Sequence, residues 1–531
     1  MLDVSLVPDI LIQQRVPVIL LDILIQTMDR QTENGSWDEQ PEVTACAIFT
    51  LGETLKLPWI HSIKPEVIQS LARGRVYLER HDKSNGNGYD VQVTEVKNSS
   101  NIFFPLRQAA LKMNEFDQIP TLGRKTSKLL CVQSSQARKF KNFFSRVPAF
   151  INEPSWKLEL WILQAFQFVP ELSRVRLEIF PRKNVSEDKY LQYIPFTWIS
   201  CSNGGSKMNL ETQWEMMWVS LLMYQADEYM EAVVGQEFWH DLEWVKELVR
   251  KCCSPSTEKP THKRNFNEME ISEMESNEMS LTRTDGRFVL AQKNEGSRKE
   301  VEEVFTGFIF HVRQHPKVFS SSKWLQVWLA KEIEKFPLAH IKHLEDCLLF
   351  SKEAEGSNQP TIFSSARVSY FDWVRTTSSD TTSCPFAFVL FLCCIHEPSK
   401  ETLASGLPRY VVQSACRHLA TMCRQHNDIG SVHRDYAEKN LNSINFSELI
   451  DGLEDADDSD LYQKQAALRK ELLKISEFER KELDRDLGEL DKLVDAKIMA
   501  LLRVFVKVTD LYGQIYLIRD IGVTKIARDS K

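Results

Sequence analysis

The chain has 531 residues, of which 43% are hydrophobic and 26% are charged, and its formal net charge is −8. This composition is typical of a soluble globular protein large enough for two or more domains. The acidic balance argues against nucleic acid as a partner, because nucleic-acid-binding surfaces are normally basic. The longest apolar run, PFAFVLFLCCI at 385–395, is shorter than the roughly 18 residues of a membrane span.

The N-terminus and the cysteines indicate the compartment in which we expect the chain. The opening MLDVSLVPDILIQQR has an early acid and lacks the basic segment that begins a secretory signal. The eleven cysteines are scattered, two pairs of them are adjacent, and no C-x-x-C zinc pattern occurs. We therefore expect a reduced, cytoplasmic protein.

The first element with a recognisable pattern is TENGSWDEQPEVTACAIFTL, residues 32–51. A Gly-Ser-Trp turn is followed there by an apolar segment, Val43 to Leu51, which predicts a helix. Taken alone, the stretch indicates a turn and a helix and no more. A polar break follows at residues 80–100.

Most of the remaining chain shows the apolar spacing of helices. Apolar residues recur at i, i+3 and i+4 in 156–172, 212–234 and 302–316. Strand signals are weak, and 19 glycines and 20 prolines are few for an all-β chain of this length. The predicted fold class is therefore all-α. Residues 254–300 are rich in Ser, Glu, Asn, Lys and Thr, which predicts a disordered insertion, and the charged segment 453–490 predicts a solvated helix.

The segment LLMYQADEYMEAVVG, residues 221–235, carries acids inside an otherwise apolar, aromatic helix. Asp227 and Glu231 stand four residues apart, so their side chains project from one face, with Glu228 beside the first. Two such carboxylates repel each other unless a cation lies between them. Because Mg²⁺ prefers oxygen ligands, the pair predicts a magnesium site. A solvated helix edge is the alternative for this motif alone.

A second oxygen-rich motif lies in CRQHNDIGSVHRDYAEKN, residues 423–440. Asn427, Ser431 and Asp435 stand at i, i+4 and i+8 and so share one stripe of a helix. An amide oxygen, a hydroxyl and a carboxylate together suit a second Mg²⁺. Gly430 weakens a helix, and we expect it to admit a closely approaching ligand. Taken alone, the motif is also consistent with a polar helix face.

The two motifs together, in an all-α chain, resemble the class I fold of terpene synthases. Further stretches resemble the fungal bifunctional diterpene synthases of the copalyl diphosphate/ent-kaurene synthase type: YIPFTWISC (193–201), DWVRTTSSDTTSCPF (372–386), KNLNSINFSEL (439–449) and DLYGQIYLIRDI (510–521). GSWDEQPEVTACAIFTL resembles the QW-type repeat near the end of the class II cyclase region of that family. The resemblance implies a class I helical bundle at 121–531 and, at 1–120, a remnant of the class II α-barrel region.

The chain departs from this family in what precedes the QW-type stretch. The bifunctional proteins carry a whole class II region there, with a DxDD motif as its acid. A literal DADD occurs here at Asp455–Asp458, but it lies downstream of Asn427 in a charged segment, where we expect an acidic loop. Protonation of geranylgeranyl diphosphate at a class II site is therefore not expected.

The resemblance implies a Mg²⁺-dependent enzyme with three metal ions and an isoprenoid diphosphate as its only expected partner. Asp227 and Glu231 would hold Mg²⁺ at one rim of a cavity, and Asn427, Ser431 and Asp435 would hold it at the facing rim. The implied substrate is a bicyclic C20 diphosphate such as copalyl diphosphate. The implied product is an ent-kaurene-like or pimaradiene-like diterpene. The oligomeric state stays open.

Other side chains are candidates for holding the diphosphate and the carbocation. Arg375 and Arg434 would contact the diphosphate, and Tyr512 and Arg519 would close over it, although a surface role is the alternative for each. Three aromatic residues near Pro195 could stabilise the cation through their ring faces. We expect Pro195 to kink its helix and to turn these rings inward, with ordinary core packing as the alternative. The three rings are those of Tyr193, Phe196 and Trp198.

Two other classes of function compete with this interpretation. A prenyl-elongating enzyme shares the helical architecture and the diphosphate chemistry, but it would be expected to carry two Asp-rich motifs. The second motif here is of the Asn/Ser/Asp type, which favours a cyclase. A truncated, non-catalytic helical relative is the remaining alternative.

Overall fold

The computed structural model describes residues 15–57, 59–85, 100–113, 134–174, 180, 190–233, 238–254, 295–355, 361–396, 403–450 and 461–518. Within these ranges every regular element is a helix, and an isolated bridge between Gln31 and Trp37 is the sole strand-like pairing. The all-α prediction is confirmed. Most of the predicted insertion, and the DADD sequence, lie outside the described residues.

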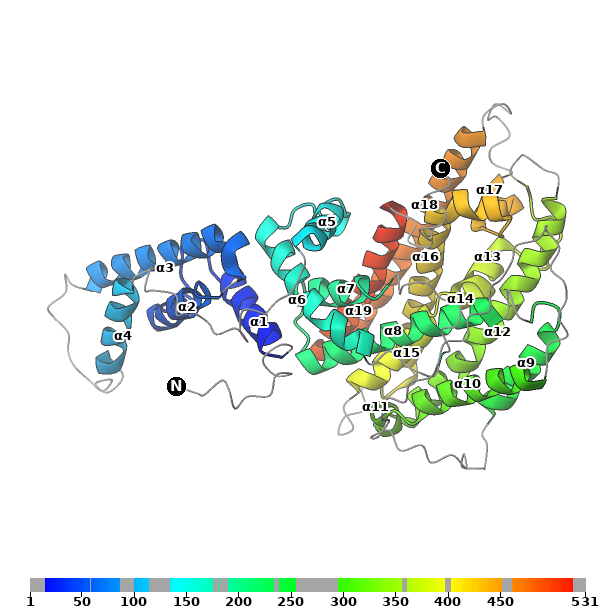
Figure 1. The fold of residues 1–531 in the computed structure, drawn as a ribbon, viewed down its shortest axis with the longest axis horizontal. Helices are drawn as coiled ribbons and strands as arrows, with labels where there is room; N and C mark the ends of the chain where they lie inside the picture. Colours follow the sequence, from blue (N-terminus) through cyan, green and yellow to red (C-terminus); the bar gives the residue numbers. More distant parts are fainter. Residues whose placement is uncertain are drawn as a thin grey trace, which may run out of the picture.

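Helices α1 (Val16–Asp29), α2 (Pro41–Thr54), α3 (Lys64–Asn85) and α4 (Ser100–Lys112) form the smaller lobe in Figure 1. The predicted turn precedes the predicted helix, since Gly35 has a φ of +91° and α2 follows. A Cβ atom at Gly35 would come closer than 3.0 Å to the carbonyl oxygen of Arg73, so the turn requires glycine for space as well as for its φ. Helix α1 packs against α6 and joins this lobe to the rest.

The larger lobe contains the helices from α5 onward (Figure 1). They are α5 (Ser134–Phe144), α6 (Ser155–Arg174), α7 (Tyr193–Asn203), α8 (Leu210–Ala232), α9 (Leu242–Cys253), α10 (Glu295–Arg313), α11 (Pro316–Ser320), α12 (Lys323–Glu353), α13 (Tyr370–Trp373), α14 (Ser379–Thr381), α15 (Cys384–Ile395), α16 (Gly406–Glu438), α17 (Ser447–Ile450), α18 (Leu461–Leu493) and α19 (Ala496–Ile518). The segment 156–172 lies in α6, residues 212–232 lie in α8 and residues 302–313 lie in α10, as their apolar spacing predicts.

Helix α15 forms the centre of the larger lobe. Eleven of its residues are buried, and it packs against α8, α12 and α16. Among the described helices none is by itself long and apolar enough to cross a membrane. One bent pair, Tyr370–Thr381 with Cys384–Ile395, reaches that length and composition jointly across a bend of 59°.

Helix α16 packs tightly against α18 on one side and α19 on another. A Cβ atom at Gly430 would come closer than 3.0 Å to the carbonyl oxygen of Tyr516 on α19, and one at Gly513 would clash equally with the ring of His426. The space at Gly430 is thus taken by a neighbouring helix rather than by a ligand, so that expectation was wrong. The charged segment forms helix α18, as predicted. One face of α18 buries Leu468 and Leu472 among others, and its remaining described side chains are partly or fully exposed.

Pro195 lies at the N-terminal end of α7, where a proline does not kink a helix. The proline is the third residue of the helix, in the first turn, where a missing N–H breaks no hydrogen bond. The expected kink was therefore wrong. The aromatic side chains of α7 project from different faces of the helix. Trp198 lines a cavity, whereas Tyr193 and Phe196 pack against Phe144 in the core.

Candidate active site

A cavity of about 730 Å³ lies between α7, α8, α12, α15, α16 and α19. Side chains of Asp227, Glu228 and Glu231 line it from α8, and Asn427, Asp435 and Glu438 line it from α16. The fold thus brings to one cavity two motifs that are far apart in the sequence. Apolar and aromatic side chains, including Met223, Leu344, Ala387, Phe505 and Val508, form other parts of its wall.

The α8 rim of the cavity is partly open to solvent. The Asp227 side chain is 33% exposed, and its Oδ1 atom lies 3.1 Å from Nε2 of His340 on α12. His340 lines the cavity too and is itself buried. Asp227 therefore lies beside one buried imidazole, and its carboxylate lines the cavity.

The α16 rim is more deeply buried. Ser431 is buried and donates a hydrogen bond of 2.5 Å from its hydroxyl to Oδ2 of Asp435, while the same oxygen accepts a bond of 2.7 Å from Nδ2 of Asn442. Asp435 and Asn427 line the cavity, whereas Ser431 lies behind Asp435. Asn427, Ser431 and Asp435 thus lie along one face of α16, as predicted, and the Ser431 hydroxyl is hydrogen-bonded to the Asp435 carboxylate.

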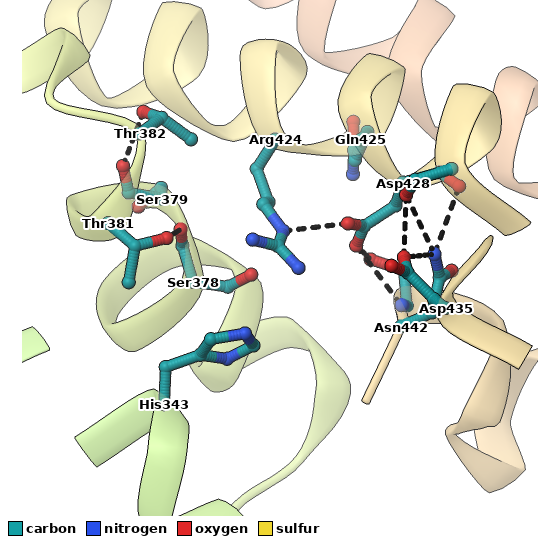
Figure 2. A network of polar contacts seen from close by, with 12 residues as sticks. His343, Ser378, Ser379, Thr381, Thr382, Arg424, Gln425, Asp428, Asp435 and Asn442 are labelled. Atoms are coloured by element: carbon teal, nitrogen blue, oxygen red, sulfur yellow. Dashed lines mark hydrogen bonds and ion pairs between the residues drawn. The ribbon is translucent and has the colours of Figure 1, made fainter. Parts of the chain in front are cut away.

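Two arginines of α16 line the cavity. Arg434 was predicted, and its Nε atom lies 3.6 Å from Oδ1 of Asp435. Arg424, one turn before Asn427, was not predicted. Its Nε atom is 2.8 Å from Oδ1 of the fully buried Asp428, and Figure 2 shows its guanidinium between Asp428, Ser378 and His343.

Two neighbouring carboxylates keep Arg424 charged. Burial lowers the pKa of its guanidinium, but the charges of Asp428 and Asp435 outweigh burial and keep that pKa above its ordinary value. The neighbouring His343 is neutral, since burial and then the charge of Arg424 hold the pKa of the imidazole well below its usual range. A spacing of three residues before Asn427 was the available signal for Arg424, because it places both side chains on one helix face.

Of the other predicted basic residues, Arg375 lies away from the cavity. Arg375 is not among the cavity-lining residues; its Nη2 atom is 2.6 Å from Oε1 of the buried Glu479, which also contacts His418. Its guanidinium also lies over the ring of Phe371. Arg519 lies outside the described residues.

The predicted aromatic residues divide between the cavity and the core. Trp198 lines the cavity, and its indole donates a hydrogen bond of 2.9 Å to the Ser220 hydroxyl. Phe196 is fully buried against Phe144, with ring centroids 3.9 Å apart, and Tyr193 packs in the same aromatic cluster. Neither Phe196 nor Tyr193 is among the cavity-lining residues.

Four tyrosines form a wall of the cavity, and of these the sequence predicted a role only for Tyr512. Tyr224 stacks on Tyr190 at 3.8 Å between centroids and meets Tyr512 edge-on. The hydroxyls of Tyr190 and Tyr516 are 3.3 Å apart, and Thr197 donates to the Tyr512 hydroxyl at 3.2 Å. Burial raises the pKa of Tyr512, so its phenol stays protonated. Tyr224 precedes Asp227 by three residues, and that spacing on the helix was the missed signal.

The oxygen ligands at the two rims fit Mg²⁺ in their chemistry. Carboxylate, amide and hydroxyl oxygens are the ligands this ion takes from proteins, together with water and substrate phosphate. In the described part of the chain, no three His, Cys, Asp or Glu side chains converge closely enough to hold a metal by themselves. A metal here would therefore draw on Asn427 and on ligands from outside the protein.

Comparisons with known proteins give relatives over nearly the whole chain. The chain is 32% identical to a pimaradiene synthase of Emericella nidulans over 96% of its length, and 30% identical to a bifunctional ent-kaurene synthase of Gibberella fujikuroi over 93%. It is 26% identical to a phyllocladan-16-alpha-ol synthase of Phomopsis amygdali over 95%. The chain spans about half the length of these relatives, namely 52%, 50% and 52%.

The chain was also compared with protein-family models and with solved structures. No family model matches the chain. Among solved structures, a cucumene synthase variant superposes with a TM-score of 0.38 at 10% identity, covering 67% of this chain and 92% of that one.

Proposed function

We propose that this chain, which is related to fungal diterpene synthases, is itself a class I diterpene synthase. Its substrate would be a bicyclic C20 diphosphate such as copalyl diphosphate. It would ionise this substrate with Mg²⁺, cyclise the cation to an ent-kaurene-like or pimaradiene-like diterpene, and release diphosphate. The observation that supports this most is the meeting of the α8 and α16 motifs in one cavity with apolar and aromatic walls.

Each rim has a role in binding the diphosphate end of the substrate. Asp227 and Glu231 would hold metal at one rim, and Asn427 and Asp435 at the other, with three ions in all. Ser431, the third residue of the predicted α16 set, would act at that rim through its hydrogen bond to Asp435. When bound, Mg²⁺ neutralises the negative charge that collects on the leaving diphosphate. Arg434 and Arg424 line the same cavity with permanent positive charge, which suits contact with phosphate oxygens.

The allylic C–O bond then breaks, and its electron pair leaves with the diphosphate. The hydrocarbon cation that remains must be kept from water until its rings have formed. The rings of Trp198, Tyr224 and Tyr512 line the cavity and can stabilise it by about 0.5–2 kcal/mol each. Loss of a proton from carbon then gives the alkene product.

Further parts of the proposal concern the whole chain. We assign residues 121–531 to the class I domain and residues 1–120 to part of a class II region, with a cytoplasmic location. The buried Trp37, whose backbone bridges to Gln31, is consistent with a QW-type repeat in residues 1–120.

The test is to incubate the full chain with Mg²⁺ and, in separate reactions, copalyl diphosphate and geranylgeranyl diphosphate, and to identify the hydrocarbons by mass spectrometry. A cyclic diterpene from copalyl diphosphate alone is expected. Asp227→Ala should abolish it, and Glu489→Ala, at an exposed acid of α18, should not. An elongated prenyl diphosphate would identify a prenyl-elongating enzyme, and no product from either substrate would identify a non-catalytic relative.

A further inference from the structure

We infer that Asn442, which follows α16, is a positioning residue that aims the carboxylate of Asp435 into the cavity. This inference rests on the proposed function, because it assigns Asp435 to the metal. The signal is a buried amide that contacts three groups of α16: the carboxylate of Asp435, the hydroxyl of Ser431 and the backbone carbonyl of Asp428. Figure 2 shows Asn442 beside Asp435 and Asp428.

The chain reverses direction at the end of α16 and thereby brings Asn442 back to the helix. Lys439 has a φ of +56°, in the left-handed region, and its N–H and that of Asn440 reach the last turn of the helix. The N–H of Asn440 donates to the carbonyl of Asp435 at 2.8 Å. Residues 441–446 then lie alongside the final turns of α16, where the candidate metal motif is.

The amide group of Asn442 is oriented by its partners on both sides. Its Oδ1 atom accepts a hydrogen bond of 3.2 Å from the N–H of Ile444, so its Nδ2 group must face α16. Nδ2 donates to Oδ2 of Asp435 at 2.7 Å and to the carbonyl of Asp428 at 3.0 Å, and it lies 3.5 Å from the Ser431 hydroxyl. Asn442 is 2% exposed. A carboxylate at 442 could not donate in this way, which explains the amide.

One oxygen of Asp435 is thereby fully engaged. Oδ2 accepts from Ser431 and from Asn442, and these two bonds set the rotation of the carboxylate. Asp435 lines the cavity, so its remaining acceptor capacity is directed there. Partners that hold a ligating carboxylate commonly contribute 10- to 100-fold to metal affinity.

The adjacent residue anchors the same turn from the other side. Ser443 donates to Oδ2 of Asp428 from its hydroxyl at 2.5 Å and from its N–H at 3.1 Å. Asp428 in turn is paired with Arg424. The turn is therefore fixed to α16 at two carboxylates, of which one lines the cavity and one supports a cavity-lining arginine.

An apolar cluster below the turn makes it rigid. Leu441, Ile444 and Phe446 are buried in a cluster with Trp373 and Leu472, and the rings of Trp373 and Phe446 are 4.8 Å apart. Because this cluster holds the backbone, a change in the Asn442 side chain should alter the carboxylate more than the turn.

Asn445 supplies a matched control in the same turn. Its Oδ1 atom accepts from the N–H of Asn442 at 2.9 Å, and its Nδ2 group donates to the carbonyl of Thr361 at 3.1 Å. It therefore stabilises the turn through two bonds, neither of which involves Asp435. Asn445→Ala weakens the turn alone, and Asn442→Ala weakens both the turn and the orientation of Asp435.

The experiment titrates Mg²⁺ into the parent chain, Asn442→Ala and Asn445→Ala, each with inorganic diphosphate at a fixed concentration. The readouts are the rise in melting temperature, the heat of binding and the Mg²⁺ dependence of turnover. We expect Asn442→Ala to raise the midpoint in Mg²⁺ by about tenfold or more, with turnover recovering at high Mg²⁺. Asn445→Ala should lower the melting temperature and leave that midpoint within about twofold.

Each result separates this inference from the proposed function. If the parent chain binds Mg²⁺ with diphosphate and the two variants shift the midpoint equally, or neither shifts it, the positioning role of Asn442 is overturned and the proposed function stands. If the parent chain shows no binding and no turnover, the proposed function fails and this inference fails with it. A shift confined to Asn442→Ala supports both.

Discussion

The two rims of the cavity are built differently. On α16 the Asp435 side chain is 10% exposed, and its Oδ2 atom accepts two hydrogen bonds from buried partners. On α8 the Asp227 side chain is 33% exposed and contacts the imidazole of His340. A buried carboxylate requires donors, because leaving it without them costs several kcal/mol. One rim is therefore organised before ligands arrive, while the other has room to adjust to them.

The largest effect is expected at Asp435. Asp435→Ala removes a proposed metal ligand and should lower turnover at least about 100-fold, the size of loss seen when one charge-stabilising group is removed. It also leaves Ser431 and Asn442 without their shared acceptor, so the free energy of unfolding should fall by about 1–3 kcal/mol. Turnover with copalyl diphosphate and urea unfolding measure the two effects. An unchanged unfolding free energy would contradict the picture of a preorganised rim.

The close packing of α16 on α19 can be tested at Gly430, which lies against the carbonyl of Tyr516. Gly430→Ala places a methyl group against the carbonyl of Tyr516 and should cost about 1–3 kcal/mol, the range for overpacked sites. The control is Gly488→Ala on α18, where the added Cβ meets nothing within 4 Å and should stabilise by roughly 1 kcal/mol. Thermal and urea unfolding measure both. Equal responses would show that close packing of α16 on α19 is not needed.

Acid should weaken the packing of α16 against α18 and α19 through His426, which contacts Ser476 and Gly513. Burial, followed by the charge of Arg480, lowers the pKa of His426 to about 4. The unfolded chain binds the proton near pH 6.5 and the folded chain near pH 4, so stability falls as the pH drops between these values. The loss amounts to about 2 kcal/mol at pH 5. Unfolding at pH 7.5 and pH 5 should show a smaller difference for His426→Gln than for the parent chain or for His433→Gln, at an exposed position.

The smallest effect on stability is expected at the α8 rim. Asp227→Ala should change the free energy of unfolding by less than about 1 kcal/mol, because a partly exposed contact contributes little. Activity should nevertheless be lost, since Asp227 is a proposed metal ligand. A loss of stability as large as that of Asp435→Ala would remove the difference between the rims.

Several features of this molecule were readable from the sequence because they depend on local spacing. The helical period in 156–172, 212–234 and 302–316 follows from apolar residues at i, i+3 and i+4, and the structure has helices there. The spacing of Asp227 with Glu231 and of Asn427 with Asp435 was enough to place each pair on one helix face, and all four side chains line the cavity.

Long-range packing decided what spacing could not. Arg375 is a cation in a polar stretch, but the fold pairs it with Glu479, more than a hundred residues away. Phe196 and Trp198 are two residues apart and so face different sides of α7, and only the arrangement of neighbouring helices determines that Trp198 meets the cavity. Gly430 was interpreted as space for a ligand, yet α19 fills that space.

By itself, then, the sequence determined an all-α chain and the face of each helix that carries its acids, because side-chain direction repeats every 3.6 residues. Only the tertiary structure decided which of these faces meet, because that depends on contacts between segments hundreds of residues apart. The same contacts place Arg424 at the cavity wall and Asn442 against Asp435. The spacing of Arg424 and Asn427 places both on one helix face, but whether that face meets the cavity, and whether Asn442 meets Asp435, depends on the packing of α16 against the segments that surround it.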